Sequence, residues 1–105
     1  MDKMQLATTY EFTFADGDKC ELTLAFIRIK RLASKNRSLY DRYNKTMVNG
    51  PKEELEMLTV VYAAYVCANL DKDNILTEDQ FIEKCGSDRR ALQNALNSLI
   101  NPKKQ

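Results

Sequence analysis

Three groups of side chains in this sequence of 105 residues have types and spacings that could do chemistry. The first is Asp71-Lys72-Asp73-Asn74-Ile75-Leu76-Thr77-Glu78, which resembles the start of a calcium-binding EF-hand loop. The rest of the loop does not fit. Leu76 stands where the sharp turn needs glycine, and Ile82 stands where the closing carboxylate should be. We therefore expect a polar loop leading into a helix, and no metal site.

The second group is basic and aromatic, and could contact nucleic acid through phosphates and stacked bases. Its members are Lys30, Arg31, Lys35, Arg37, Tyr40, Arg42 and Tyr43. Tyr40 and Tyr43 are at helical spacing with Leu39 and Met47, so they are expected to face the core. The basic residues are then a solvated helix end. A small nucleic-acid-binding regulator is kept as the alternative function.

The third group, Glu53, Glu54 and Glu56, could supply carboxylates for acid–base catalysis. These residues lie in the expected first turn of a helix, where negative charge stabilises the helix dipole without any catalytic role. No nucleophile, glycine-rich loop or second acid cluster accompanies them. The sequence has no histidine, which excludes histidine-dependent triads and histidine-ligated zinc. We expect no enzyme and no cofactor.

Cysteine usage and composition point to a cytoplasmic protein. Cys20, Cys67 and Cys85 fit neither a disulfide framework nor a paired-cysteine metal site, which favours a reducing compartment. The N-terminal Met1–Gln5 opens on charge rather than as a secretory leader, and no apolar run is long enough to span a membrane. The net charge of +1 indicates neither nucleic acid nor membrane. The length predicts a single domain, 1–105.

The elements that must position these residues begin with a β-hairpin at about 8–24. Thr8–Phe14 alternates polar and apolar residues, Asp16-Gly17 is a typical hairpin turn, and Lys19–Leu24 alternates again. Five helices are expected after it, at about 25–35, 38–48, 51–69, 77–85 and 88–100. Helix-terminus residues mark them: Asn36 or Ser38, Pro51, Thr77 with Gln80, Gly86 and Ser87. The predicted fold class is α+β, mostly α, with the hairpin packed on a bundle of four to five helices.

The stretch Leu55–Leu70 is the one around which the other elements must be arranged. Between Met57 and Ala68 its only clearly polar residue is Thr59, so it has no polar face. It is either a central core helix or a helix that another chain covers on one side. The hairpin, Phe26–Leu32, Leu39–Met47 and the last helix offer enough apolar faces to cover it. The pattern alone therefore favours a core helix.

Four segments, taken in order, form a further pattern: Phe12-Thr13-Phe14-Ala15-Asp16-Gly17, the segment from Leu32 to Asn44, the helix from Glu54 to Leu70 with Val61-Tyr62-Ala63-Ala64-Tyr65, and Leu76-Thr77-Glu78-Asp79-Gln80-Phe81. Together these segments resemble the tail assembly chaperones of long-tailed bacteriophages and prophages of low-GC Gram-positive bacteria. The resemblance implies a chaperone in the host cytoplasm that keeps the helical tape measure protein soluble until tail-tube subunits polymerise around it. A structural head–tail or tail-completion protein is a further alternative.

The resemblance also implies a longer form, made by a programmed ribosomal frameshift, whose extension recruits the tail tube protein. Asn101-Pro102-Lys103-Lys104-Gln105 fits this, because Pro-Lys-Lys can be encoded by a slippery run of adenines. We expect an apolar groove, repeated along a homo-oligomer, to cover tape measure helices. The candidate contacts are Leu58, Val61, Tyr62, Tyr65, Leu92, Leu96 and Leu99.

Overall fold

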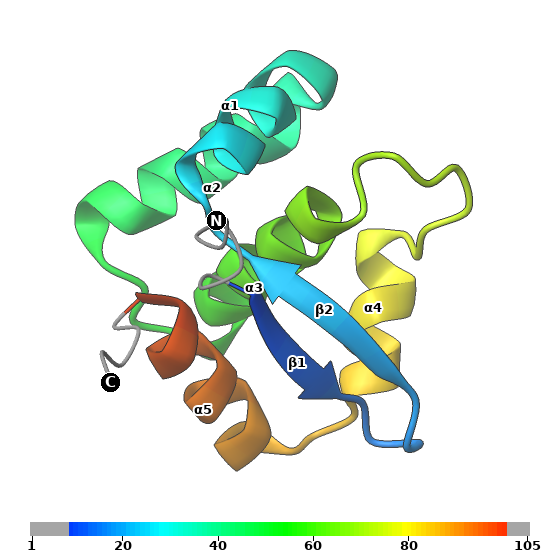
Figure 1. Cartoon of the computed structure of the whole chain (residues 1–105). Coiled ribbons are helices and arrows are strands. Elements are labelled where there is room, and N and C mark those ends of the chain that lie inside the picture. The colour runs from blue at the N-terminus through cyan, green and yellow to red at the C-terminus, as the bar shows by residue number, and fades with distance from the viewer. Residues whose placement is uncertain (1–8, 101–105) are drawn as a thin grey trace, which may run out of the picture.

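The computed structural model describes residues 9–100 and has an antiparallel hairpin followed by five helices (Figure 1). This confirms the predicted α+β, mostly helical fold class. The elements are β1 (Thr9–Thr13), β2 (Lys19–Thr23), α1 (Phe26–Lys35), α2 (Arg37–Asn49), α3 (Glu54–Ala68), α4 (Glu78–Cys85) and α5 (Arg89–Ile100). Each helix in this part of the chain is too short or too polar to cross a bilayer.

The hairpin presents one apolar face to the helices. Phe12 pairs with Cys20 and Tyr10 with Leu22, so alternate side chains of both strands point the same way. Phe12 and Leu22 are buried, whereas Glu11 and Glu21 on the other face are exposed. Gly17 has a φ of +96°, which a turn of this kind needs and which other residues rarely adopt.

Helix α3 is the centre of the fold, as its composition predicts. It contacts β2 and all four other helices, and every side chain from Thr59 to Cys67 is buried (Figure 1). The Thr59 hydroxyl donates a hydrogen bond to the carbonyl of Leu55 at 3.2 Å, which satisfies this buried polar group. Of the two predicted alternatives for this stretch, the structure has the core helix.

Phe81 of α4 joins the hairpin to α3. Its side chain is 0% exposed, and its ring centroid lies 5.4 Å from that of Phe14 and 5.0 Å from that of Tyr65. The rings of Phe12 and Tyr62 complete the cluster at 6.3 and 5.4 Å. These separations are typical of aromatic pairs that contribute beyond their buried area. The short helix α4 is thereby held against both the hairpin and α3.

Most of the expected helix ends are present. The Asn36 side chain accepts a hydrogen bond from the Leu39 N–H and caps α2. Thr77 and Gln80 form the expected reciprocal capping box at the start of α4. Gly86 ends α4 with a φ of +67°. Local sequence is sufficient to place these boundaries.

Two helix starts differ from the prediction. Helix α3 begins at Glu54 rather than Pro51, because the Glu56 carboxylate reaches back to accept hydrogen bonds from the N–H groups of Lys52 and Glu53. Helix α5 is capped by Asp88 rather than Ser87, since the Asp88 carboxylate accepts from the Ala91 N–H at 3.0 Å. In both cases a carboxylate supplies the cap.

Candidate partner-binding surface

The structure places most of the predicted contact residues inside the protein. Five of the seven are buried in the hydrophobic core: Val61, Tyr62, Tyr65, Leu92 and Leu96. Their side chains therefore do not form a partner surface on the folded chain, because the neighbouring elements already cover them. Leu58 and Leu99 are half-buried and stay candidates.

Tyr62 and Tyr65 have a structural task that explains their burial. The Tyr62 hydroxyl donates to the carbonyl of Leu76 at 2.9 Å, and the Leu76 N–H donates to the Tyr65 hydroxyl at 2.8 Å. Both backbone groups of one loop residue are thus held by two tyrosines one turn apart on α3. These two hydrogen bonds attach the loop before α4 to the core. They also satisfy both tyrosine hydroxyls, which usually have a hydrogen-bond partner when they are buried.

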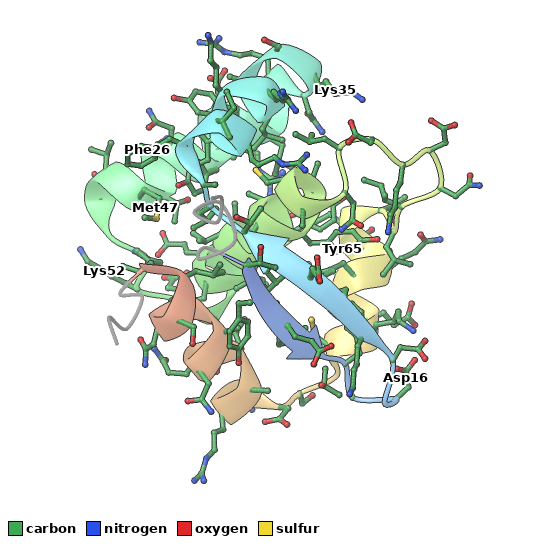
Figure 2. All side chains as sticks on the ribbon, viewed as in Figure 1. Asp16, Phe26, Lys35, Met47, Lys52 and Tyr65 are labelled. Carbon is green, nitrogen blue, oxygen red and sulfur yellow. The ribbon has the colours of Figure 1, made fainter. Side chains whose placement is uncertain are left out.

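Several large apolar side chains remain outside the core at the ends of helices. At the start of α1 and the end of α2, Phe26 is 90%, Ile27 56% and Val48 76% exposed. We call these three residues the arm surface. Figure 2 shows Phe26 and Met47 at the same end of the α1–α2 pair. A run of exposed bulky apolar groups of this kind marks a candidate interaction site.

A second set of exposed apolar side chains lies at the start of α3 and at the end of α5, two helices that contact each other. Leu55 is 69% and Ile100 36% exposed, and the half-buried Leu58 and Leu99 belong to the same two helix ends. We call these four residues the edge surface. Leu58 and Leu99, the two predicted contact residues that are not fully buried in the core, therefore belong to the edge surface.

Sequence reasoning missed the arm surface. The segment Phe26–Leu32 was expected to turn its apolar side chains toward α3, and Leu32 does so. Phe26 and Ile27 do not. The sequence does indicate that Phe26 and Ile27 are exposed. Lys30 lies four residues after Phe26 and Arg31 four residues after Ile27, so each apolar residue shares a helix face with a charged one.

The predicted basic patch offers little to a nucleic acid base. Tyr43 is buried, as expected, and burial raises the pKa of its hydroxyl. Tyr40 is half-buried with the Arg37 guanidinium 5.4 Å from its ring centroid. Arg42 makes two hydrogen bonds to the Glu78 carboxylate, at 2.9 and 2.7 Å. Both rings are thus occupied within the fold.

The glutamates at the start of α3 are occupied by structure. Glu54 forms an ion pair with Arg89 of α5. Hydrogen bonds from the N–H groups of Lys52 and Glu53 hold the pKa of the Glu56 carboxyl below its usual value. These contacts explain the acidic first turn without acid–base chemistry.

The three cysteines are unsuited to nucleophilic chemistry. Burial raises the pKa of Cys67 to about 12 and is also the largest cause at Cys20, about 12, and Cys85, about 11. At neutral pH all three are therefore protonated thiols, and the thiolate is the reactive form. None is in a disulfide.

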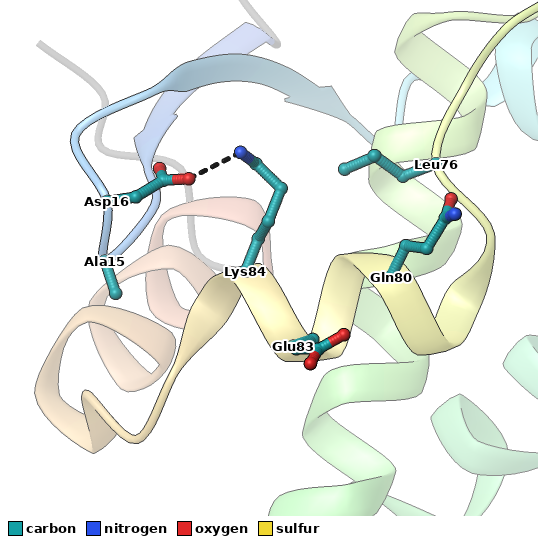
Figure 3. A pocket seen from close by; sticks show the side chains of 6 residues that line it. All are labelled: Ala15, Asp16, Leu76, Gln80, Glu83 and Lys84. Carbon is teal, nitrogen blue, oxygen red and sulfur yellow. Dashed lines mark hydrogen bonds and ion pairs between the residues drawn. The ribbon is translucent and has the colours of Figure 1, made fainter.

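An open hollow of about 420 Å³ lies between the hairpin turn and α4 (Figure 3). Lys84 crosses its floor and pairs with Asp16 at 2.6 Å and Asp18 at 2.7 Å. The hydrogen bond from Lys84 lowers the pKa of Asp16. This cation is already paired with two carboxylates of its own chain, so the hollow presents no free cation to a ligand.

Comparison of the chain with protein-family models, curated proteins and solved structures gives no match. Within residues 9–100, no group of three or more histidine, cysteine, aspartate and glutamate side chains is placed to hold a metal ion. The function must therefore be argued from the two exposed apolar surfaces.

Proposed function

We propose that this protein is a tail assembly chaperone of a long-tailed bacteriophage or prophage of Gram-positive bacteria. In the host cytoplasm it binds helices of the tape measure protein and keeps that protein soluble while the tail tube assembles. One observation carries the proposal. The core closes around α3 and Phe81, yet Phe26, Ile27 and Val48 remain largely exposed. Bulky apolar groups outside a complete core suit a protein that covers another chain's apolar face.

A binding role rather than catalysis is supported by the way the reactive side chains are used. The first-turn glutamates, the half-buried lysine of the hollow and the tyrosines of α3 all have partners within the fold. In the proposal, the chaperone acts by covering apolar surface and releases its client when tube subunits replace it. A frameshifted longer form recruiting the tail tube protein, and self-association of the chain, belong to the same proposal.

Co-expression tests this function directly. A long helical reading frame encoded beside this gene would be the candidate tape measure protein, and it is expressed alone and together with this protein. We expect most of it in the insoluble fraction without this protein and in the soluble fraction, co-purifying, with it. Tape measure protein that stays insoluble at equal expression of both chains would overturn the proposal.

A nucleic-acid-binding regulator is the second candidate, and the cations of α1 and α2 are the observation that favours it. A gel-shift assay with DNA and RNA at low salt separates the two functions, since the chaperone should give no retained band. A structural head–tail or tail-completion protein would remain in purified particles. Mass spectrometry of virions therefore distinguishes that alternative, because a chaperone should be absent from them.

A further inference from the structure

The near-zero net charge hides a strong separation of charge within the molecule. Residues 26–49, which form α1 and α2, contain seven lysines and arginines but only one acid, Asp41. The rest of the chain contains nine basic and fourteen acidic residues. We call α1 and α2 together the basic arm. In Figure 1 the arm packs along one side of the molecule, away from the hairpin turn.

Some cations of the arm are neutralised or satisfied by the fold. Arg37 pairs with Asp41 at 3.1 Å, and Arg42 pairs with Glu78 at 2.7 Å. The Lys35 ammonium donates to the carbonyl of Leu70 at 2.8 Å. These three tie the arm to itself and to the rest of the protein, so they are not free for a partner.

Three other cations of the arm are free. Lys30, Arg31 and Lys45 are exposed, and none of them forms an ion pair or side-chain hydrogen bond with its own chain in the structure of residues 9–100. A fourth, Arg28, has a buried Nη1 atom without a hydrogen-bond partner among the described residues. The arm therefore carries positive charge that its own carboxylates do not balance.

The free cations are spaced regularly relative to the arm surface. Lys30 follows Phe26 by four residues, Arg31 follows Ile27 by four, and Lys45 precedes Val48 by three. Residues three or four apart share a face of a helix. Each exposed apolar side chain thus has an unpaired cation one turn away. The edge surface differs, because Glu53, Glu54 and Glu56 surround Leu55.

We propose that the basic arm docks an amphipathic helix whose apolar stripe is flanked by aspartate and glutamate. This inference rests on the proposed function and names the chemistry of the client segment. The stripe would cover Phe26, Ile27 and Val48, while the flanking carboxylates would pair with the free cations. Basic helices would be rejected by like-charge repulsion. The arm thus selects which part of a long helical client is held.

The arm fits such a helix better than it fits nucleic acid. Base stacking needs exposed aromatic rings, and of the three aromatic residues of the arm only Phe26 offers one, because Tyr43 is buried and Tyr40 is half-buried beneath Arg37. Ile27 and Val48 are aliphatic and can neither stack on a base nor hydrogen-bond to it. An acidic amphipathic helix matches the arm in two ways: its apolar stripe can cover the apolar side chains, and its carboxylates can pair with the cations beside them.

The test uses the full chain and two fluorescent synthetic peptides of about 18 residues, roughly five helical turns. Both peptides carry the same leucine stripe, flanked by glutamate in one and by lysine in the other. Fluorescence anisotropy should show saturable, salt-sensitive binding of the acidic peptide and at least about tenfold weaker binding of the basic one. Equal affinities for the two peptides would overturn the inference.

Charge-reversed variants locate the site. Lys30→Glu/Arg31→Glu/Lys45→Glu should weaken binding of the acidic peptide at least about tenfold. The matched control is Lys19→Glu/Lys72→Glu/Arg90→Glu, which reverses three exposed cations outside the arm and should leave affinity unchanged. Equal losses in both triple variants would contradict the assignment. Circular dichroism melts show whether each variant is folded.

Other occupants of the arm are outcomes of the same assay. Tighter binding of single-stranded DNA or of phosphatidylserine vesicles than of the acidic peptide would overturn the inference. Self-association that the arm triple variant abolishes would do so too. The proposed function fails separately: if the tape measure protein is solubilised equally by the wild type and the arm variant, only the present inference is lost. If neither chain solubilises it but the acidic peptide still binds, only the proposed function is lost.

Discussion

Helix α3 buries nine consecutive side chains, from Thr59 to Cys67, whereas α1 buries only Leu32. Both helices are rich in large apolar residues, but α3 has neighbours on all sides, while α1 packs mainly against α2 and α3. Packing therefore buries the apolar surface of α3 from Thr59 onward and leaves part of the apolar surface of α1 in water. An apolar helix identifies the core, and the apolar residues that the core does not need identify the candidate binding surface.

The largest expected effect contrasts two phenylalanines from these two regions. Phe81→Ala should lower the free energy of unfolding by about 3–5 kcal/mol, because it removes a fully buried ring from the aromatic cluster. Phe26→Ala should change it by no more than about 0.5 kcal/mol, since that ring is 90% exposed. Urea unfolding of both variants checks this. Similar losses in the two variants would show that Phe26 belongs to the core.

A smaller effect tests the tyrosines of α3. Tyr65→Phe should cost about 1 kcal/mol of unfolding free energy, because the Leu76 N–H loses its hydrogen-bond acceptor. Tyr40→Phe is the matched control, since within the described residues its hydroxyl forms no hydrogen bond, and we expect no measurable change. A loss of client binding by Tyr65→Phe without a loss of stability would return this residue to the partner surface.

A third effect concerns the pair between the hairpin turn and α4. The pKa of Asp16 lies below its ordinary value of 3.8, chiefly through the hydrogen bond from Lys84. A carboxyl whose pKa is lowered by folding stabilises the fold above its unfolded pKa, and this contribution is lost as pH falls through the folded value. Asp16→Asn should therefore lower the urea midpoint at neutral pH, and the difference from wild type should shrink below pH 3.8.

The control for the acid-dependent effect is Asp73→Asn, which changes an exposed carboxylate that makes no ion pair within residues 9–100. Its urea midpoint should stay near that of the wild type at both pH values. A difference for Asp16→Asn that grows on acidification would contradict the role assigned to Lys84.

Much of the fold could be predicted because its determinants are local. Alternation and Asp16-Gly17 define the hairpin, and Thr77 with Gln80 defines the start of α4. The predicted start of α3 was wrong because two local signals compete. Pro51 favours a start at residue 51, whereas the Glu56 carboxylate caps the N–H groups of Lys52 and Glu53, so the helix begins at Glu54. Local preference cannot decide between two good helix starts.

The proposed binding surface could not be predicted in the same way, because it depends on which apolar faces remain exposed after packing. Leu92 and Leu96 have the spacing of a docking stripe, but α5 uses them against the core. The separation of charge was visible in the sequence, since between Glu21 and Asp41 there is no acidic residue. Counting charge by segment rather than over the whole chain would have pointed to the arm.

The smallest expected change in stability belongs to variants that locate the proposed client site, which we place on the basic arm and not on the edge surface. Phe26→Ser/Val48→Ser is co-expressed with the candidate tape measure protein, and Leu55→Ser, which alters an exposed residue of the edge surface, is the control. Both variants should unfold within about 0.5 kcal/mol of the wild type. We predict that the arm variant leaves the tape measure protein insoluble while Leu55→Ser keeps it in solution. Full solubility with the arm variant, or its loss only with Leu55→Ser, would contradict the account.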